Sequence, residues 1–167
     1  NDVEISTLNI IYNSWNGPNW SPCTWDMIQI NNTNITNILT DHCGLSFGFH
    51  FFENKTNYQY VQRIEFSTAG LMENIEGTIP ISIANLSGLI DLGFNFNTGI
   101  YGTIPNSLCN NTDLSFLRIK GTALTGTIPS CIFDLPKLTV IEFLDVNITV
   151  TSDNMIQLCN NAKMRYK

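Results

Sequence analysis

The sequence predicts a right-handed solenoid of short parallel strands, α/β in class, with about four coils behind an N-terminal cap. Three observations support this fold class. The tetrapeptide Gly-Thr-Ile-Pro occurs at residues 77–80, 102–105 and 126–129, at spacings of 25 and 24 residues. Leucine-like residues recur at matching places between these copies, and a segment containing Trp and Cys precedes them. A repeat of this length is typical of stacked coils.

Each coil is predicted to contribute one short strand. Its apolar residues include two that are separated by a single residue, and this period of two sends both side chains to one face of a strand. One coil of roughly 24 residues buries too little apolar surface to offset its loss of backbone entropy, so the coils must stabilise one another by stacking. The apolar positions of successive coils are Val61, Ile64 and Phe66; Leu86, Leu89, Leu92 and Phe94; Leu114, Leu117, Ile119 and Leu124; and Leu135, Leu138, Ile141, Phe143 and Ile148.

With these motifs the chain resembles the plant-like extracellular class of leucine-rich repeats, whose repeat reads L-x-x-L-x-x-L-x-L-x-x-N-x-L-x-G-x-I-P. Residues 114–129 follow this pattern almost position for position. The resemblance extends to a cap that many extracellular members close with a Trp and a Cys pair. The matching residues here are Leu8, Tyr12-Asn13-Ser14, Asn16-Gly17, Asn19-Trp20 and Cys23-x-Trp25.

The resemblance implies one solenoid domain over residues 1–167. Within it we expect an N-terminal cap at 1–60, leucine-rich repeats at 61–150 and a degenerate C-terminal coil at 151–167. The C-terminal coil is called degenerate because residues 150–153 stand where the fourth Gly-x-Ile-Pro would be.

The chain departs from the family pattern in its asparagine column, which in the family hydrogen-bonds the turn after each strand. This column is occupied here by Ala69, Asn97, Thr122 and Val146. Only one of the four keeps the amide, so we expect the other turns to satisfy their buried backbone groups in another way.

The five cysteines indicate an oxidising compartment. By the family resemblance, Cys23 and Cys43 would close the cap, although their spacing is longer than usual. Cys109 and Cys131 fall at similar places in adjacent coils and could form a bridge. A Cys131–Cys159 bridge is the competing pairing, and unpaired buried thiols are the third reading. Cys-x-x-Cys spacing is absent, which argues against zinc.

Asparagines in N-x-Ser/Thr motifs predict N-linked glycans on a secreted or cell-surface protein. Asn85 and Asn110 each lie eight residues after the glycine of their Gly-Thr-Ile-Pro motif, so they should share a column on the outer side of the solenoid. Asn19 is the weakest candidate because Pro22 follows its Ser. The predicted glycosylation sites are Asn31, Asn34, Asn54, Asn85, Asn110 and Asn147.

Composition and motifs exclude several classes of function. The net charge of −6, with only eight Lys and Arg, argues against nucleic acid. The chain has no run of 18 apolar residues that could span a membrane. The missing initiator Met fits a processed secreted product. The two histidines, His42 and His50, match no catalytic motif, and a Cys43–His50 dyad would lose its thiol to the cap disulfide. We therefore expect no catalysis, cofactor or metal.

The outward strand positions predict a protein contact surface. Read across coils they form columns, among them Arg63, Asp91, Phe116 and Val140; Glu65, Gly93, Arg118 and Glu142; and Ser67, Asn95, Lys120 and Leu144. Arg118 is expected beside Glu142, and a loose patch of apolar residues is expected beside these charges. The predicted partner-binding residues are Ile90, Phe116, Arg118, Val140, Glu142 and Leu144.

Two functions follow from this surface. The first is a non-catalytic secreted glycoprotein that contacts protein, as a structural or self-assembling coat or fibre subunit that binds copies of itself through an open C-terminal end. The second, which the resemblance implies for some plant-like members, is a ligand-recognition or enzyme-inhibitor module.

Overall fold

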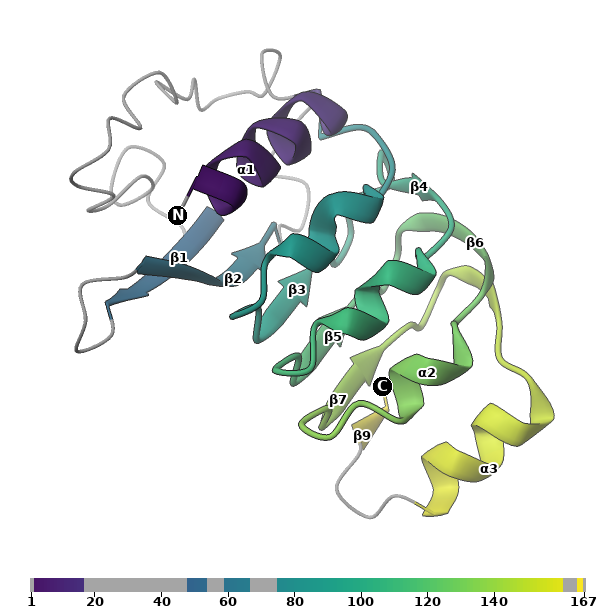
Figure 1. The fold of residues 1–167 in the computed structure, drawn as a ribbon. Coiled ribbons are helices and arrows are strands. Elements are labelled where there is room, and N and C mark those ends of the chain that lie inside the picture. Colours follow the sequence, from purple (N-terminus) through teal and green to yellow (C-terminus); the bar gives the residue numbers. More distant parts are fainter. Residues whose placement is uncertain (1, 17–47, 54–58, 67–74, 161–164, 167) are drawn as a thin grey trace.

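The computed structural model describes residues 2–16, 48–53, 59–66, 75–160 and 165–166, and it stacks successive coils side by side (Figure 1). A six-stranded sheet runs along one side in the order β1-β2-β3-β5-β7-β9, and a three-stranded sheet has the order β4-β6-β8. The helical elements are α1 (Asp2–Ser14), η3 (Ile81–Asn85), η4 (Asn106–Asn110), α2 (Ser130–Phe133) and α3 (Ser152–Asn160). The strands are β1 (Gly48–Glu53), β2 (Gln59–Glu65), β3 (Asp91–Gly93), β4 (Tyr101–Gly102), β5 (Phe116–Arg118), β6 (Ala123–Thr127), β7 (Val140–Glu142), β8 (Asn147–Thr149) and β9 (Arg165–Tyr166).

Each Gly-Thr-Ile-Pro motif leads directly into a helical turn. Its proline stands immediately before η3, η4 and α2 and holds φ at a value suited to starting a helix. Its isoleucine, Ile79, Ile104 or Ile128, is at most 4% exposed and lies in the core. Thus each motif fixes one core contact and one helix start, which explains why it recurs once per coil.

The register of the six-stranded sheet is the one that the apolar pattern predicts. Ile64, Leu92, Leu117 and Ile141 lie side by side in parallel strands and are fully buried. Because side chains alternate along a strand, their neighbours in sequence form the outward columns. The predicted column of Arg63, Asp91, Phe116 and Val140 is therefore confirmed, as is the one beginning at Glu65.

Trp15 closes the first coil at the end of α1. Its ring is fully buried and meets Phe66 and Phe94 edge-on, at centroid distances of 5.7 and 4.9 Å. Its indole Nε1 donates a hydrogen bond of 2.8 Å to the carbonyl oxygen of Thr78. A Cβ on Gly77 would lie 1.7 Å from the carbonyl oxygen of Ser14, so a glycine is needed where the helix end meets the coil.

The predicted cap segment contributes a strand of its own. Within the predicted 1–60 segment, β1 pairs antiparallel with β2 and so extends the six-stranded sheet. Cys23, Cys43, Asn31, Asn34 and His42 lie outside the described residues, as does Asn54.

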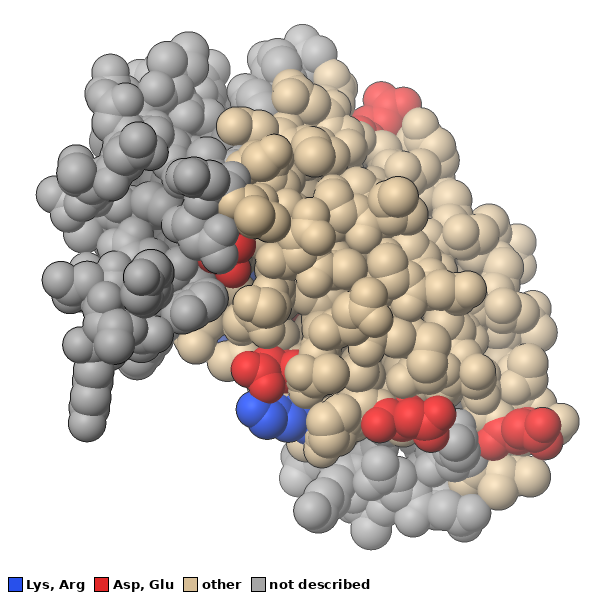
Figure 2. Space-filling model, viewed as in Figure 1, with Lys and Arg blue, Asp and Glu red and all other residues tan. Residues whose placement is uncertain are grey.

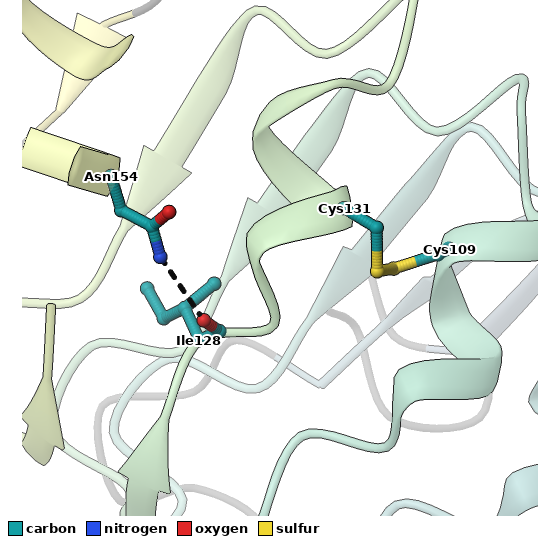
Figure 3. The surroundings of a disulfide bond; sticks show 4 residues. All are labelled: Cys109, Ile128, Cys131 and Asn154. Carbon is teal, nitrogen blue, oxygen red and sulfur yellow. Dashed lines mark hydrogen bonds between the residues drawn. A yellow bond between two sulfur atoms is a disulfide. The ribbon is translucent and has the colours of Figure 1, made fainter. Parts of the chain in front are cut away.

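The C-terminal segment, predicted as a degenerate coil, adds a further strand to the six-stranded sheet. β9 pairs in parallel with β7, opposite Val140 and Ile141. Asn154 of α3 is 3% exposed, and its Nδ2 donates a hydrogen bond of 3.4 Å to the carbonyl oxygen of Ile128 (Figure 3). The repeat pattern is irregular here because this strand is only two residues long and no Gly-x-Ile-Pro precedes it.

In the asparagine column, the coil of β3 keeps the amide, and the next coil satisfies its turn with another side chain, as expected. Asn97 Nδ2 donates to the carbonyl oxygens of Phe66 and Phe94. In the next coil Thr122 takes this role, since its hydroxyl donates a 2.8 Å hydrogen bond to the carbonyl oxygen of Ile119. A threonine thus replaces the asparagine where the side chain has to reach only the carbonyl oxygen three residues earlier.

A disulfide joins Cys109 of η4 to Cys131 of α2, at a Cα–Cα distance of 5.7 Å (Figure 3). It therefore crosslinks the helical turns of adjacent coils, on the helical side of the solenoid. Of the two pairings that the sequence left open for Cys131, the structure has the bond to Cys109.

Replacing Cys109 and Cys131 together by serine is expected to lower the free energy of unfolding by about 3 kcal/mol, because the loop of 22 residues gains freedom in the unfolded chain. Urea unfolding followed by circular dichroism measures the change. The native protein in reductant should match the double variant. Equal urea midpoints for the oxidised protein and the variant would contradict the crosslink.

Candidate partner-binding face

The candidate site is the outward face of the six-stranded sheet, where side chains from four coils lie in rows. Its centre is an ion-pair network around Asp91, whose side chain is only 1% exposed. Arg118 Nη1 lies 2.7 and 2.6 Å from the two carboxylate oxygens of Asp91, and Arg63 Nε lies 3.2 Å from one of them. Glu65 completes the network, 3.7 Å from Arg118 and 3.6 Å from Arg63.

The environment of Asp91 acts on its proton equilibrium in two directions. Burial raises the pKa of Asp91, because a charge is poorly solvated there. The hydrogen bond from Arg118 and the positive charges of Arg118 and Arg63 oppose that rise. A buried carboxylate of this kind needs its cations, so the network fixes the positions of both arginines on the face.

Arg118 lies opposite Glu142 in the strand register, as the sequence predicts. Its ion-pair partners, however, are Asp91 and Glu65 on the other side. Glu142 instead accepts a 2.7 Å hydrogen bond from Asn95 Nδ2, two strands away. The buried carboxylate attracts the guanidinium more strongly than the better solvated one does.

The predicted apolar patch is divided rather than continuous. Phe116 and Val140 are register partners, and the Arg118 guanidinium lies 4.9 Å from the Phe116 ring centroid. Ile90 is next to them, since its carbonyl oxygen accepts from the amide of Phe116. Leu144 lies four residues beyond Val140, which is about 13 Å along an extended chain. The row of Arg118 and Glu142 therefore separates Leu144 from the other three.

A second exposed cluster, which the sequence did not single out, lies at the ends of the strands. Phe96 is 48% exposed, and the ammonium nitrogen of Lys120 lies 5.1 Å from its ring centroid. Leu144, which is 52% exposed, follows in the next coil. Lys120 and Leu144 were already in one predicted column. Phe96 could have been found from the sequence because it aligns with Gly121, at a turn position where an aromatic residue is unexpected.

The candidate glycosylation sites that the structure describes are all exposed. Asn85 and Asn110 are the last residues of η3 and η4 and so occupy equivalent places in successive coils, while Asn147 lies in β8. Asn85 Nδ2 donates a 3.2 Å hydrogen bond to the Thr7 hydroxyl. Figure 2 shows a broad uncharged surface over η3, η4 and α2, with acidic side chains toward its edges.

Two features are absent from the part of the chain that the structure describes. Within the residues that the structure places, no group of three or more His, Cys, Asp or Glu side chains could hold a metal ion. None of the described helices combines the length and the apolar character needed to cross a membrane.

Known proteins similar to part of this chain include a plant receptor-like protein. No family model matches the chain. Receptor-like protein 6 of Arabidopsis thaliana is 35% identical over 69 residues, which are 41% of this chain and 7% of that protein. This chain therefore spans a small part of that relative's length.

Two solved structures from the same plant have similar folds. The leucine-rich-repeat ectodomain of the receptor kinase SOBIR1 gives a TM-score of 0.65 at 15% identity, over all of this chain and 82% of the other. The ectodomain of the receptor kinase GASSHO1/SCHENGEN3, in complex with CASPARIAN STRIP INTEGRITY FACTOR 2, gives 0.59 at 21% identity, over 96% of this chain and 17% of the other. These likenesses confirm the leucine-rich-repeat solenoid fold.

Proposed function

We propose that this plant-like leucine-rich-repeat protein is a non-catalytic extracellular recognition module that binds a protein partner through the outward face of its six-stranded sheet. The observation that carries the proposal is the Asp91 network beside exposed apolar side chains. Charged groups that are held rigidly by a buried carboxylate present a fixed pattern, and adjoining apolar groups supply contact area. The fold likeness to a receptor ectodomain solved with a bound partner supports the same reading.

The positions of the candidate glycosylation sites support the choice of face. We infer that Asn85, Asn110 and Asn147 carry N-linked sugars, along with Asn31, Asn34 and Asn54 in the cap. Asn85 and Asn110 lie on the helical side, away from the outward face of the large sheet. Glycans there would shield the uncharged surface of Figure 2 and leave the sheet face bare.

Self-association is a second candidate, and one observation favours it. Met155 and Ile156 on α3 are 43% and 57% exposed, so the C-terminal end presents apolar side chains to solvent. A copy of the same chain that covered this end would produce the coat or fibre subunit that the sequence suggested.

A photo-crosslinking amino acid separates these two functions. Placed at Phe116 on the sheet face, it is expected to capture one dominant protein from the native extracellular material, because that face contacts the partner. The same group at Ile81, which is 77% exposed on η3, is the matched control and should capture little. Mass spectrometry identifies the product. A third position, Ile156 on α3, tests self-association, and capture of the chain's own copies from it would favour that function. Equal labelling from Phe116 and Ile81 would refute the proposed face.

A further inference from the structure

The turns that follow β3, β5 and β7 each contain a residue with positive φ. Phe96, Gly121 and Asp145 occupy equivalent positions in three successive coils, with φ values of 65°, 64° and 57°. Glycine adopts this left-handed conformation freely, and Asp tolerates it because its short side chain can bond to nearby backbone. A phenylalanine there is strained, because its Cβ crowds the backbone.

The strain at Phe96 is not offset by burial of its ring. About half of the residue is exposed, so it contributes little to the core. The next coil nevertheless makes room for the ring. A Cβ on Gly121 would lie 3.1 Å from Phe96 Cδ1, closer than most such contacts, so a larger residue at 121 would press on it. A glycine at position 96 would satisfy the fold equally well, which indicates that the ring has a role outside folding.

Lys120 is the cation that this ring positions. Among the described cations of the sheet face, Arg63 and Arg118 share the carboxylates of Asp91 and Glu65. Lys120 has no carboxylate within ion-pair distance in the part of the chain that the structure describes, and Glu142 is engaged by Asn95. The ammonium lies over the Phe96 ring, which attracts it electrostatically without neutralising its charge.

The backbone holds these groups in a fixed arrangement. The amide of Phe96 donates a 2.7 Å hydrogen bond to the carbonyl oxygen of Lys120, and the amide of Gly121 donates one of 2.9 Å to that of Leu144. Three coils are therefore locked together at this edge. An exposed ring, an uncompensated cation and an exposed Leu144 are thus presented in one row without further ordering, which favours tight binding.

We propose that Phe96, Lys120 and Leu144 form a subsite for a partner segment that carries an acidic side chain between apolar ones. This inference rests on the proposed function, since the subsite lies on the same sheet face. The carboxylate would pair with Lys120, and the flanking apolar groups would pack on Phe96 and Leu144. The strained turn is then retained because it aims the ring at the partner.

Selection from a displayed library of random peptides on the intact protein tests the subsite. Peptides enriched on the native protein should contain Asp or Glu next to apolar residues. Phe96→Gly should weaken their binding at least tenfold while its urea midpoint stays equal or rises, because glycine relieves the strain. Lys120→Met should remove the preference for Asp and Glu and keep that for apolar residues. Ile81→Gln, on the helical side, is the control and should change neither.

Three results would overturn the subsite: enriched peptides without acidic residues, no enrichment on the native protein, or a Phe96→Gly variant that unfolds at lower urea concentration. Failure of the subsite is distinguishable from failure of the proposed face. If Phe116→Gln weakens the selected peptides and Phe96→Gly does not, the face stands and the subsite falls. Peptides insensitive to both variants would refute both.

Discussion

Replacing Trp15 by alanine is expected to lower the free energy of unfolding by about 3 to 5 kcal/mol, the range measured for large aromatic truncations in cores. The change removes a fully buried ring and its edge-on contacts with Phe66 and Phe94. It also leaves the carbonyl oxygen of Thr78 without its indole donor. Because α1 meets the first coil through this side chain, the helix should detach at lower denaturant concentration than in the native protein.

Urea unfolding measures this loss of stability. It is followed by far-ultraviolet circular dichroism, because tryptophan fluorescence would change with the substitution itself. Ile10→Ala is the matched control, because Ile10 lies in the same helix and is 44% exposed. It should cost less than about 1 kcal/mol. A loss at Trp15 no greater than the loss at Ile10 would show that α1 does not close the solenoid.

The second large effect is expected at Arg118. Replacing it by methionine should lower the free energy of unfolding at neutral pH by about 3 kcal/mol, at the lower end of the range for breaking a buried pair. Asp91, which is 1% exposed in the native protein, would lose both of its shortest hydrogen bonds. Arg63, at 3.2 Å, would still compensate part of the charge.

The same substitution should make stability depend on pH in a defined direction. Burial already raises the pKa of Asp91 above its ordinary value of 3.8, and loss of Arg118 removes an opposing influence and raises it further. A raised pKa in the folded state means that the fold binds the proton more tightly than the unfolded chain does. The variant is therefore relatively most stable below pH 3.8, where Asp91 is protonated in both states, and loses stability as pH rises through the folded pKa.

Urea midpoints measured from below pH 3.8 to neutral pH check the direction in which the variant's stability changes. Two further variants serve as controls. Asp91→Leu combined with Arg118→Met should recover much of the stability, since no unpaired buried charge remains. Lys137→Met breaks an exposed 2.5 Å pair with Asp113 and should change stability by less than about 1 kcal/mol. A pH-independent deficit in the single variant would contradict the role of Asp91.

The sequence alone determined the repeat and most of its consequences. The Gly-Thr-Ile-Pro copies set the length of each coil, and the spacing of apolar residues set which side chains face the core. Since parallel strands of equal repeats pair in one register, the outward columns from Arg63 to Val140 and from Glu65 to Glu142 also followed. These features are local and repeated, so each copy reinforces the prediction made from the others.

Only the tertiary structure decided how the polar side chains on that face pair. Arg118 lies between carboxylates on two flanking strands, and its choice of Asp91 over Glu142 depends on which one is more deeply buried. The left-handed backbone at Phe96, the strand β9 and the closure of the first coil by Trp15 were likewise decided by packing. Burial and partner choice depend on coils that are distant in sequence, and a repeat pattern specifies where side chains point but not which neighbour each one will bind.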